Sequence, residues 1–178
     1  MNPSIPPWQT AGLVFTSVAG TLLHFLFDWS GGSAVAALFS AVNESIWEHM
    51  KLLFYPMLLF ALAEHRAWGK ETAGFWSVKL VGTLAGLALI PALYYTYTGA
   101  LGVSADWFNI TIFFIAAAVS FRLETRLFQK GALPPLWGGP ALLLLIGIIF
   151  TLVTFYPPQI PLFRDPITGT YGFQRAIL

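Results

Sequence analysis

The sequence has no cysteine and few charged residues. Without cysteine, the protein cannot form disulfides, use a thiolate nucleophile or hold a metal ion through cysteine ligands. Charged residues make up 10% of the 178 residues, against about 25% in soluble domains. Basic and acidic residues nearly cancel to a formal net charge of +1, so no nucleic-acid partner is expected.

Long apolar runs dominate the chain, and 57% of its residues are hydrophobic. Several runs approach the ~20 residues that a helix needs to cross a bilayer. We therefore predict an all-α fold, a polytopic membrane helical bundle of about five transmembrane helices, over residues 8–28, 45–65, 75–98, 107–126 and 137–156. We expect one membrane domain over residues 1–178, with an ordered outer tail at 157–178 that turns at "DPITG".

Basic residues are distributed unevenly among the predicted loops. The loops after the first and third spans carry no lysine or arginine, whereas those after the second and fourth spans carry Arg66, Lys70, Arg122, Arg126 and Lys130. Because cytoplasmic loops carry the excess of positive charge, we predict a multi-pass protein of the cell membrane with a cytoplasmic amino terminus. An odd number of spans then places the carboxyl terminus outside.

The second predicted span is short of uncharged residues. Its charge-free run, "LLFYPMLLFALA", extends from Leu52 to Ala63 and is flanked by Lys51 and Glu64. This run covers roughly 18 Å, against about 30 Å of hydrocarbon. On the cytoplasmic side we expect Glu64, His65 and Arg66 to snorkel to the interface. On the other side the residues before Leu52 must lie at membrane depth or in a cavity, where ionisable groups usually face the bundle interior.

Polar residues flank the connection between the first two spans. In "TLLHFLFDWSGG", His24 and Asp28 are four residues apart and share one helix face, as do Glu44 and Glu48 on the next helix. The intervening "SGGSAVAALFSAV" is too apolar for a free loop and too short to cross the membrane, so we expect a re-entrant or interfacial segment. Such a segment would bring the four residues together as catalytic acid/base groups. Ser45 and Glu48 also fit a capping box, which is a purely structural alternative for this pair.

Further polar and aromatic residues are expected at the same level of the bundle. Asp106 and Asn109 open the fourth span in "ADWFNIT", and a tryptophan stands close to the acidic residues of each earlier helix. Tryptophan rings can stabilise a positive charge by cation–π contact. The predicted substrate-binding residues are Trp29, Asn43, Trp47, His49, Lys51, Asp106 and Asn109.

Two stretches, "VNESIWEHMK" at 42–51 and "PLFRDPITGTYG" at 161–172, resemble a family of small, uncharacterised bacterial integral membrane proteins. More distantly, the chain is similar to the emopamil-binding-protein-like membrane proteins, which include sterol isomerases. His24, Asp28, Glu44 and Pro56 occupy places comparable to that family's histidine, its two glutamates and a proline, and Asn109 fits its later asparagine loosely. The resemblance implies a lipid-sized pocket whose acid/base groups and aromatic walls stabilise a carbocation. Asp28 in place of glutamate, the additional Glu48 and His49, and a fifth span depart from that pattern.

The favoured interpretation is a membrane-embedded pocket that binds a membrane lipid or an isoprenoid-like hydrophobic small molecule, with isomerase-type proton transfer as its chemistry. One alternative is a proton- or cation-coupled transporter component that uses the same carboxylates. Another is a metal-dependent membrane hydrolase, because His24, Asp28, Glu48 and His49 could supply nitrogen and oxygen ligands. We expect no cofactor, although a metal ion and a homo-oligomeric state remain open.

Overall fold

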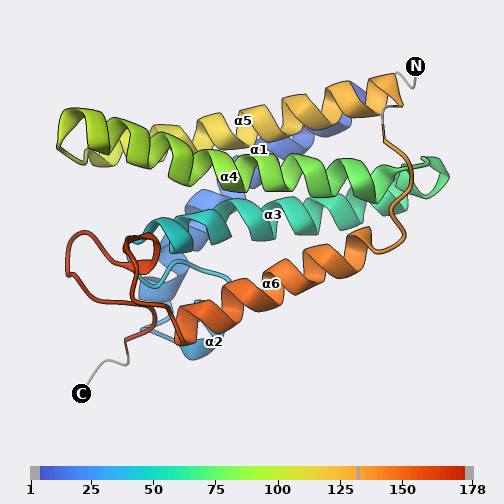
Figure 1. Cartoon of the computed structure of the whole chain (residues 1–178). Helices are drawn as coiled ribbons and strands as arrows, with labels where there is room; N and C mark the ends of the chain where they lie inside the picture. The colour runs from blue at the N-terminus through green and yellow to red at the C-terminus, as the bar shows by residue number, and fades with distance from the viewer. Residues whose placement is uncertain (1–4, 132, 175–178) are drawn as a thin grey trace.

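The computed structural model describes residues 5–131 and 133–174, which form six α-helices and two short 3₁₀ helices (Figure 1). In chain order these are α1 (Ile5–Trp29), α2 (Ala34–Ala37), α3 (Ile46–Ala67), η1 (Gly69–Glu71), α4 (Phe75–Leu101), α5 (Asp106–Lys130), α6 (Gly139–Phe155) and η2 (Pro161–Phe163). The five predicted spans coincide with α1, α3, α4, α5 and α6, with ends displaced by no more than about one helical turn. The prediction of an all-α membrane bundle is confirmed.

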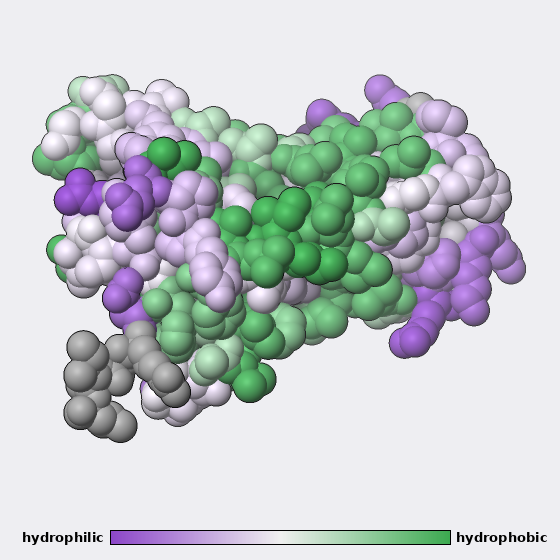
Figure 2. Space-filling view, turned by 60° about the horizontal axis from the view of Figure 1, so that its bottom comes forward, coloured by the Kyte–Doolittle hydropathy of each residue, from purple (hydrophilic) through white to green (hydrophobic). Residues whose placement is uncertain are grey.

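Four of these helices, α1, α3, α4 and α5, are long and apolar enough to cross a membrane by length and composition. The fifth, α6, is apolar but has 17 residues, which is at the lower limit of the roughly 17–25 that a span needs. On the face shown in Figure 2, hydrophobic residues cover the middle and the most hydrophilic residues lie towards the two ends. The described parts of the chain end at opposite ends of this bundle (Figure 1).

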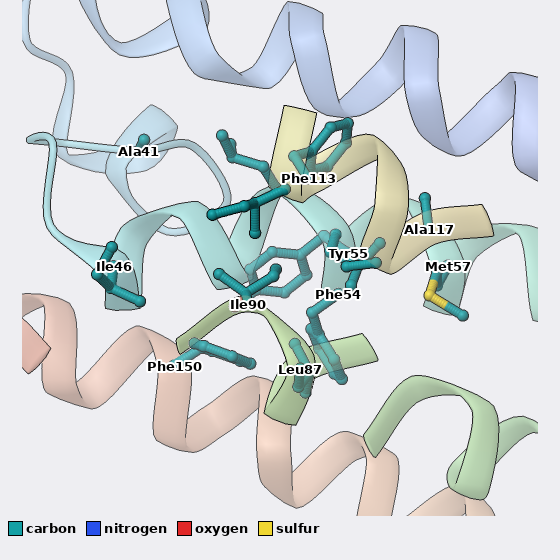
Figure 3. Close-up of a cluster of buried hydrophobic side chains, with 14 of the residues drawn as sticks. Ala41, Ile46, Phe54, Tyr55, Met57, Leu87, Ile90, Phe113, Ala117 and Phe150 are labelled. Atoms are coloured by element: carbon teal, nitrogen blue, oxygen red, sulfur yellow. The ribbon is translucent and has the colours of Figure 1, made fainter. Parts of the chain in front are cut away.

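Helix α3 lies at the centre of the bundle, in contact with α1, α4, α5 and α6 (Figure 1). Its Leu53 and Phe54 are completely buried and belong to a core that Leu87 of α4, Phe113 of α5 and Phe150 of α6 complete (Figure 3). Within the most apolar windows, 61% of α3 is buried but only 17% of α1. Polar residues on α3 therefore face protein, whereas much of α1 faces outward.

The start of α3 explains how its polar first turns are accommodated. The helix begins at Ile46, six residues before the apolar run, and the Ser45 hydroxyl caps it by accepting from the Glu48 backbone N–H at 3.4 Å. Only this half of the expected capping box forms, because the Ser45 N–H donates to Asn43 Oδ1 at 2.9 Å. The Glu48 carboxylate is thus free to accept other hydrogen bonds inside the protein.

The segment between α1 and α3, which includes α2, folds back onto the bundle. Ala37 and Ser40 are completely buried, while Val35 and Phe39 point outward. The Ser33 side chain caps the single turn of α2 by accepting from the Val35 N–H at 3.3 Å. This packed, apolar segment places Glu44 beside His24, near the end of α1.

The chain after α6 covers the same end of the bundle (Figure 1). Asp165 is buried and accepts from the Ile167 N–H and the Thr168 hydroxyl, both at 2.8 Å, which forms the turn expected at "DPITG". Phe173 then packs against Phe27 of α1 and Phe155 of α6. Of the expected ordered tail, residues 157–174 are described, and 175–178 lie outside the described residues.

Close contact between α1 and α3 depends on Gly20, one turn before His24. A Cβ atom at Gly20 would lie 2.6 Å from the Leu52 carbonyl oxygen and 2.5 Å from Phe113 Cζ. Gly20→Ala should therefore lower the free energy of unfolding by about 1–3 kcal/mol, as overpacking does. Thermal unfolding in detergent measures this change. The control is Gly99→Ala, where nothing lies within 4 Å of the added atom; equal stability of the two variants would show that α1 does not approach α3 this closely.

Candidate functional site

Three ionisable side chains from three segments converge where α1 ends and α3 begins. His24 Nε2 lies 3.7 Å from Glu44 Oε1, and His49 Nε2 lies 3.4 Å from Glu44 Oε2. One ligand atom from each residue can be chosen so that all lie within 4.8 Å of one another. We call His24, Glu44 and His49 the histidine cluster. All three are half-buried, so the cluster is shielded but remains accessible.

The orientation of His49 is set by the backbone of its own helix. His49 Nδ1 lies 2.9 Å from the Ser45 carbonyl oxygen, which can only accept a hydrogen bond. Nδ1 must therefore carry the proton, and in the neutral ring Nε2 presents its lone pair to Glu44. The His24 ring lies 5.5 Å from the His49 ring, centroid to centroid. The arrangement can hold or move a proton between carboxylate and imidazole, or surround a cation.

A cavity of about 190 Å³ opens beside the histidine cluster, between α1, α3 and α5. Its polar lining includes His24, His49 and Asn109, and its aromatic walls are Phe25, Phe113 and Phe114. Asn109 is held in place because its side-chain oxygen accepts from the Tyr97 hydroxyl and its Nδ2 donates to Ser104 Oγ at 3.2 Å. The pocket thus has one polar end and an otherwise aromatic and aliphatic wall.

Three predicted site residues do not join this pocket. Asp28 and Trp29 are exposed at the end of α1, and Trp29 stacks on Phe25 with ring centroids 5.7 Å apart. Asp106 is exposed at the first residue of α5. Asp28 shares a helix face with His24 as predicted, but the carboxylate that approaches His24 belongs to Glu44.

Glu48 and Lys51 lie in a separate, closed network with Thr154 of α6, which we call the Lys51 network. Lys51 Nζ lies 2.7 Å from Glu48 Oε2 and donates to Thr154 Oγ1 at 2.8 Å and to the Ala37 carbonyl oxygen at 2.9 Å. Glu48 also accepts from the Thr154 hydroxyl at 2.8 Å and from the Val42 N–H at 3.1 Å. Since the three donors of the ammonium are used and both side chains are almost completely buried, this network binds α3, α6 and the α1–α3 segment together.

Asn43 and Trp47 connect the start of α3 to the tail. Asn43 Nδ2 donates to the Gly172 carbonyl oxygen at 3.2 Å. The Trp47 ring packs between Phe150 of α6 and Phe163 of η2, with centroid distances of 4.5 and 4.9 Å. Asn43 and Trp47 were predicted to bind substrate, but in this structure their side chains contact other parts of the protein.

A second buried cluster, which we did not predict from the sequence, lies at the opposite end of the bundle. Lys79 Nζ of α4 forms ion pairs with Glu64 of α3 and, at 2.6 Å, with Glu124 of α5. Gln9 Nε2 of α1 donates to Glu64 Oε1 at 2.7 Å. We call Gln9, Glu64, Lys79 and Glu124 the Lys79 cluster. All four are buried, so the expectation that Glu64 snorkels to the interface is wrong: its partners keep it inside the bundle.

One sequence signal could have identified the Lys79 cluster. Lys79 is the only ionisable residue inside the long apolar run 75–98, and Glu124 lies within the next span. Ionisable residues inside spans usually pair with one another across the bundle. Glycines also mark the contact, since a Cβ at Gly82 would collide with the Glu124 side chain and one at Gly86 with Ser120. These two glycines therefore allow α4 and α5 to approach closely.

A larger hollow of about 660 Å³ lies between α1, α3 and α6, but its lining is almost entirely apolar. The Tyr55 hydroxyl in this hollow is already 3.0 Å from both the Gly147 carbonyl oxygen and Thr151 Oγ1. A hydrocarbon chain could lie there without any group to react with or to recognise a polar head. Of the two cavities, the smaller one beside the histidine cluster is the candidate site.

Comparison with known proteins identifies a family. No curated protein and no solved structure matches the chain. A family model described as a family of unknown function, DUF6512, matches residues 2–173, a region that contains the histidine cluster, the Lys51 network and the Lys79 cluster. Because this match covers nearly the whole sequence, the protein belongs to the DUF6512 family.

Proposed function

We propose that the protein binds an amphiphile of the lipid or isoprenoid class in the cavity beside the histidine cluster, with the polar end at His24, Glu44 and His49. The observation that carries this proposal is the convergence of three ionisable side chains, two of which, His24 and His49, line a cavity with aromatic walls. Clefts with apolar walls and a few convergent polar groups are the usual form of small-molecule sites.

The size and rim of the cavity suggest how such a molecule enters. A volume of about 190 Å³ holds a polar group and the first part of a chain, not a whole lipid. The rim residues Phe25, Ile110 and Phe114 expose 44%, 58% and 41% of their surface, and all are apolar. These side chains offer a hydrocarbon path outward, so the ligand would enter from the membrane and leave most of its chain along α1 and α5.

The chemistry proposed for the site is proton transfer. Each carboxylate oxygen of Glu44 lies near one imidazole, so a proton can be held on the carboxylate or on a histidine. The Phe113 and Phe114 rings in the wall can stabilise a developing positive charge. This arrangement supports the proposed kinship with emopamil-binding-protein-like isomerases through His24 and Glu44, whereas Asp28 lies outside it.

We place this site in a bacterial cell membrane, on the side opposite the cytoplasm. The resemblance of residues 42–51 and 161–172 to small bacterial membrane proteins supports the source, and the basic loops support a cytoplasmic amino terminus. The histidine cluster lies at the end of the bundle where α1 ends, and the Lys79 cluster lies at the other end. The acid/base groups would then meet ligands in the outer half of the bilayer.

Replacing Glu44 by glutamine tests the proposal. Because a hydrogen bond to a charged group contributes about 1.5–3 kcal/mol, Glu44→Gln should reduce the bound amphiphile or its affinity at least about tenfold. Native mass spectrometry of protein purified in mild detergent measures the ligand, and lipid extraction identifies it. Asp28→Asn is the matched control, since this nearby carboxylate is exposed, and it should retain the ligand. Equal amounts of bound amphiphile in Glu44→Gln and Asp28→Asn, or no bound amphiphile in the wild type, would count against the proposal.

A proton- or cation-coupled transporter component is the second candidate. Among the described residues, the buried hydroxyls of Thr16 and Ser120 have no hydrogen-bond partner. Thr16 lies on α1 between Gln9 and His24, and Ser120 lies on α5 between Glu124 and Asn109. These hydroxyls could relay protons between the two ionisable clusters. Proton flux in proteoliposomes, measured with protein free of bound amphiphile, distinguishes this candidate from the first.

A further inference from the structure

We propose that the histidine cluster is a site for a divalent transition-metal ion, with zinc as the ion that its ligands suit best. His24, Glu44 and His49 come from α1, the α1–α3 segment and α3, so the fold brings together ligands that are distant in sequence. Two imidazoles and one carboxylate form a ligand set that zinc enzymes use. Ions that prefer oxygen, such as magnesium and calcium, would find one suitable ligand here.

The spacing within the cluster fits an ion better than direct hydrogen bonds. Charge-assisted N–H···O bonds are about 2.7–2.9 Å long. The distances from Glu44 to His49 and His24 are 3.4 and 3.7 Å, too long for such bonds. Ligands at about 2.0–2.1 Å from a tetrahedral zinc ion are separated from one another by about 3.3–3.4 Å. The two observed distances, each to a different carboxylate oxygen of Glu44, equal or slightly exceed this separation.

The tautomer of His49 points to the same conclusion. Since Nδ1–H donates to the Ser45 carbonyl oxygen, the neutral ring aims the Nε2 lone pair at the Glu44 carboxylate. Two acceptors that face each other repel unless a proton or a cation lies between them. A ligating histidine typically donates its other N–H to a carbonyl or carboxylate, and Ser45 supplies that partner here.

The position of the cavity defines what the ion would do. Three protein ligands leave one tetrahedral position open, as in catalytic zinc sites. The cavity that His24 and His49 line adjoins the cluster, so a water or a ligand oxygen could reach an ion bound there. A bound ion would hold an oxygen of water or of a ligand's polar group there and polarise it, in place of the proton transfer between Glu44 and imidazole. This inference stands on the ligand geometry alone and does not require that an amphiphile binds.

Titration of the chelator-stripped full-length protein with ZnCl₂ in detergent, followed by calorimetry, tests the inference. We expect one ion per chain. Loss of a residue that hydrogen-bonds to a metal ligand costs about 10–100-fold in metal affinity, so loss of a ligand itself in Glu44→Gln or His49→Ala should cost at least about a hundredfold. Asp28→Asn and His65→Asn are the controls, because neither residue belongs to the cluster, and both should bind zinc as the wild type does.

Two further readouts keep the test independent of any activity. Zinc should raise the melting temperature of the wild type and of Asp28→Asn but not of Glu44→Gln, because only a folded site binds the ion. Cobalt(II) should give the intense visible absorption of a tetrahedral site in the wild type and in Asp28→Asn but not in Glu44→Gln. Absence of stoichiometric zinc, or equal affinity in Glu44→Gln, would overturn the inference. Protein that retains an amphiphile but binds no zinc would overturn this inference and leave the proposed function intact.

Discussion

Lys79→Met is expected to lower the free energy of unfolding by about 3–5 kcal/mol or more, the range observed when one partner of a buried ion pair is removed. Among residues 5–131 and 133–174, Lys79 is the single cation that pairs with the carboxyl groups of Glu64 and Glu124, and all three side chains are almost completely buried. Without it, two acidic groups remain in a space that excludes water. Their helices, α3 and α5, would lose the partner that α4 provides.

Aromatic rings around Lys79 add to this expected loss. Its Nζ lies 5.7 Å from the centroid of Phe75 and 5.6 Å from those of Phe121 and Phe128. Each ring can contribute cation–π attraction when the ammonium is desolvated. Methionine fills a similar volume but carries no charge, so the substitution removes the electrostatic contacts while it largely preserves the packing.

The stability of Lys79→Met is measured by thermal or denaturant unfolding in detergent. Lys70→Met, at an exposed lysine on η1, is the matched control and should change stability little. A triple variant, Lys79→Met with Glu64→Gln and Glu124→Gln, should recover part of the loss because the unpaired charges are gone. If Lys79→Met were as stable as the wild type, the Lys79 cluster would not hold the bundle together.

Lys51→Met should have a comparable effect, about 3–5 kcal/mol, at the other end of α3. It leaves the Glu48 carboxylate buried without its ammonium, and it removes the donors to Thr154 Oγ1 and the Ala37 carbonyl oxygen. Because the network joins three segments, we expect local loosening as well as a lower global stability. Hydrogen exchange should increase first in residues 30–45 and in α6.

This loosening should also reach the candidate site. The α1–α3 segment holds Glu44 against His24 and His49, so a mobile segment would weaken any ligand of the histidine cluster. Lys130→Met, at an exposed lysine at the end of α5, is the control. The double variant Glu48→Gln/Lys51→Met should recover part of the stability. If Lys51→Met exchanged hydrogen as slowly as the wild type in residues 30–45, the Lys51 network would not anchor that segment.

The helices could be predicted from the sequence because each is a long apolar run. The start of α3 followed from a length argument: the run from Leu52 is too short to cross hydrocarbon, and the helix does begin earlier, at Ile46. The length of α6 was harder to predict from the sequence. Its run is as apolar as the others, but "PPQIP" and the two glycines before Pro140 limit the helix to 17 residues.

The members of the histidine cluster were all named from the sequence, but their pairing was not. Spacing on one helix, which detects neighbours three or four residues apart, pairs His24 with Asp28 and Glu44 with Glu48. The structure pairs Glu44 with both histidines, and Glu48 with Lys51 three residues further along α3. The pairs of Glu44 depend on how the α1–α3 segment folds back, and no local pattern in "SGGSAVAALFSAV" encodes that path.

The Lys79 cluster shows a different limit of sequence reasoning. Glu64 adjoins His65 and Arg66 at the end of an apolar run, a position where snorkelling is normal. Its burial depends on Gln9 and Lys79, which lie on two other helices. Pairing across a bundle can be suspected from single charges inside spans, but the partners become known only when the helices are placed.

A high-resolution structure of the protein in lipid nanodiscs would test the proposed binding site most directly. We predict an elongated ligand in the cavity between α1, α3 and α5, with its polar end in contact with the histidine cluster or with an ion held there, and its chain along Phe113 and Phe114. Water alone in that cavity, with lipid confined to the apolar hollow between α1, α3 and α6, would contradict the proposal.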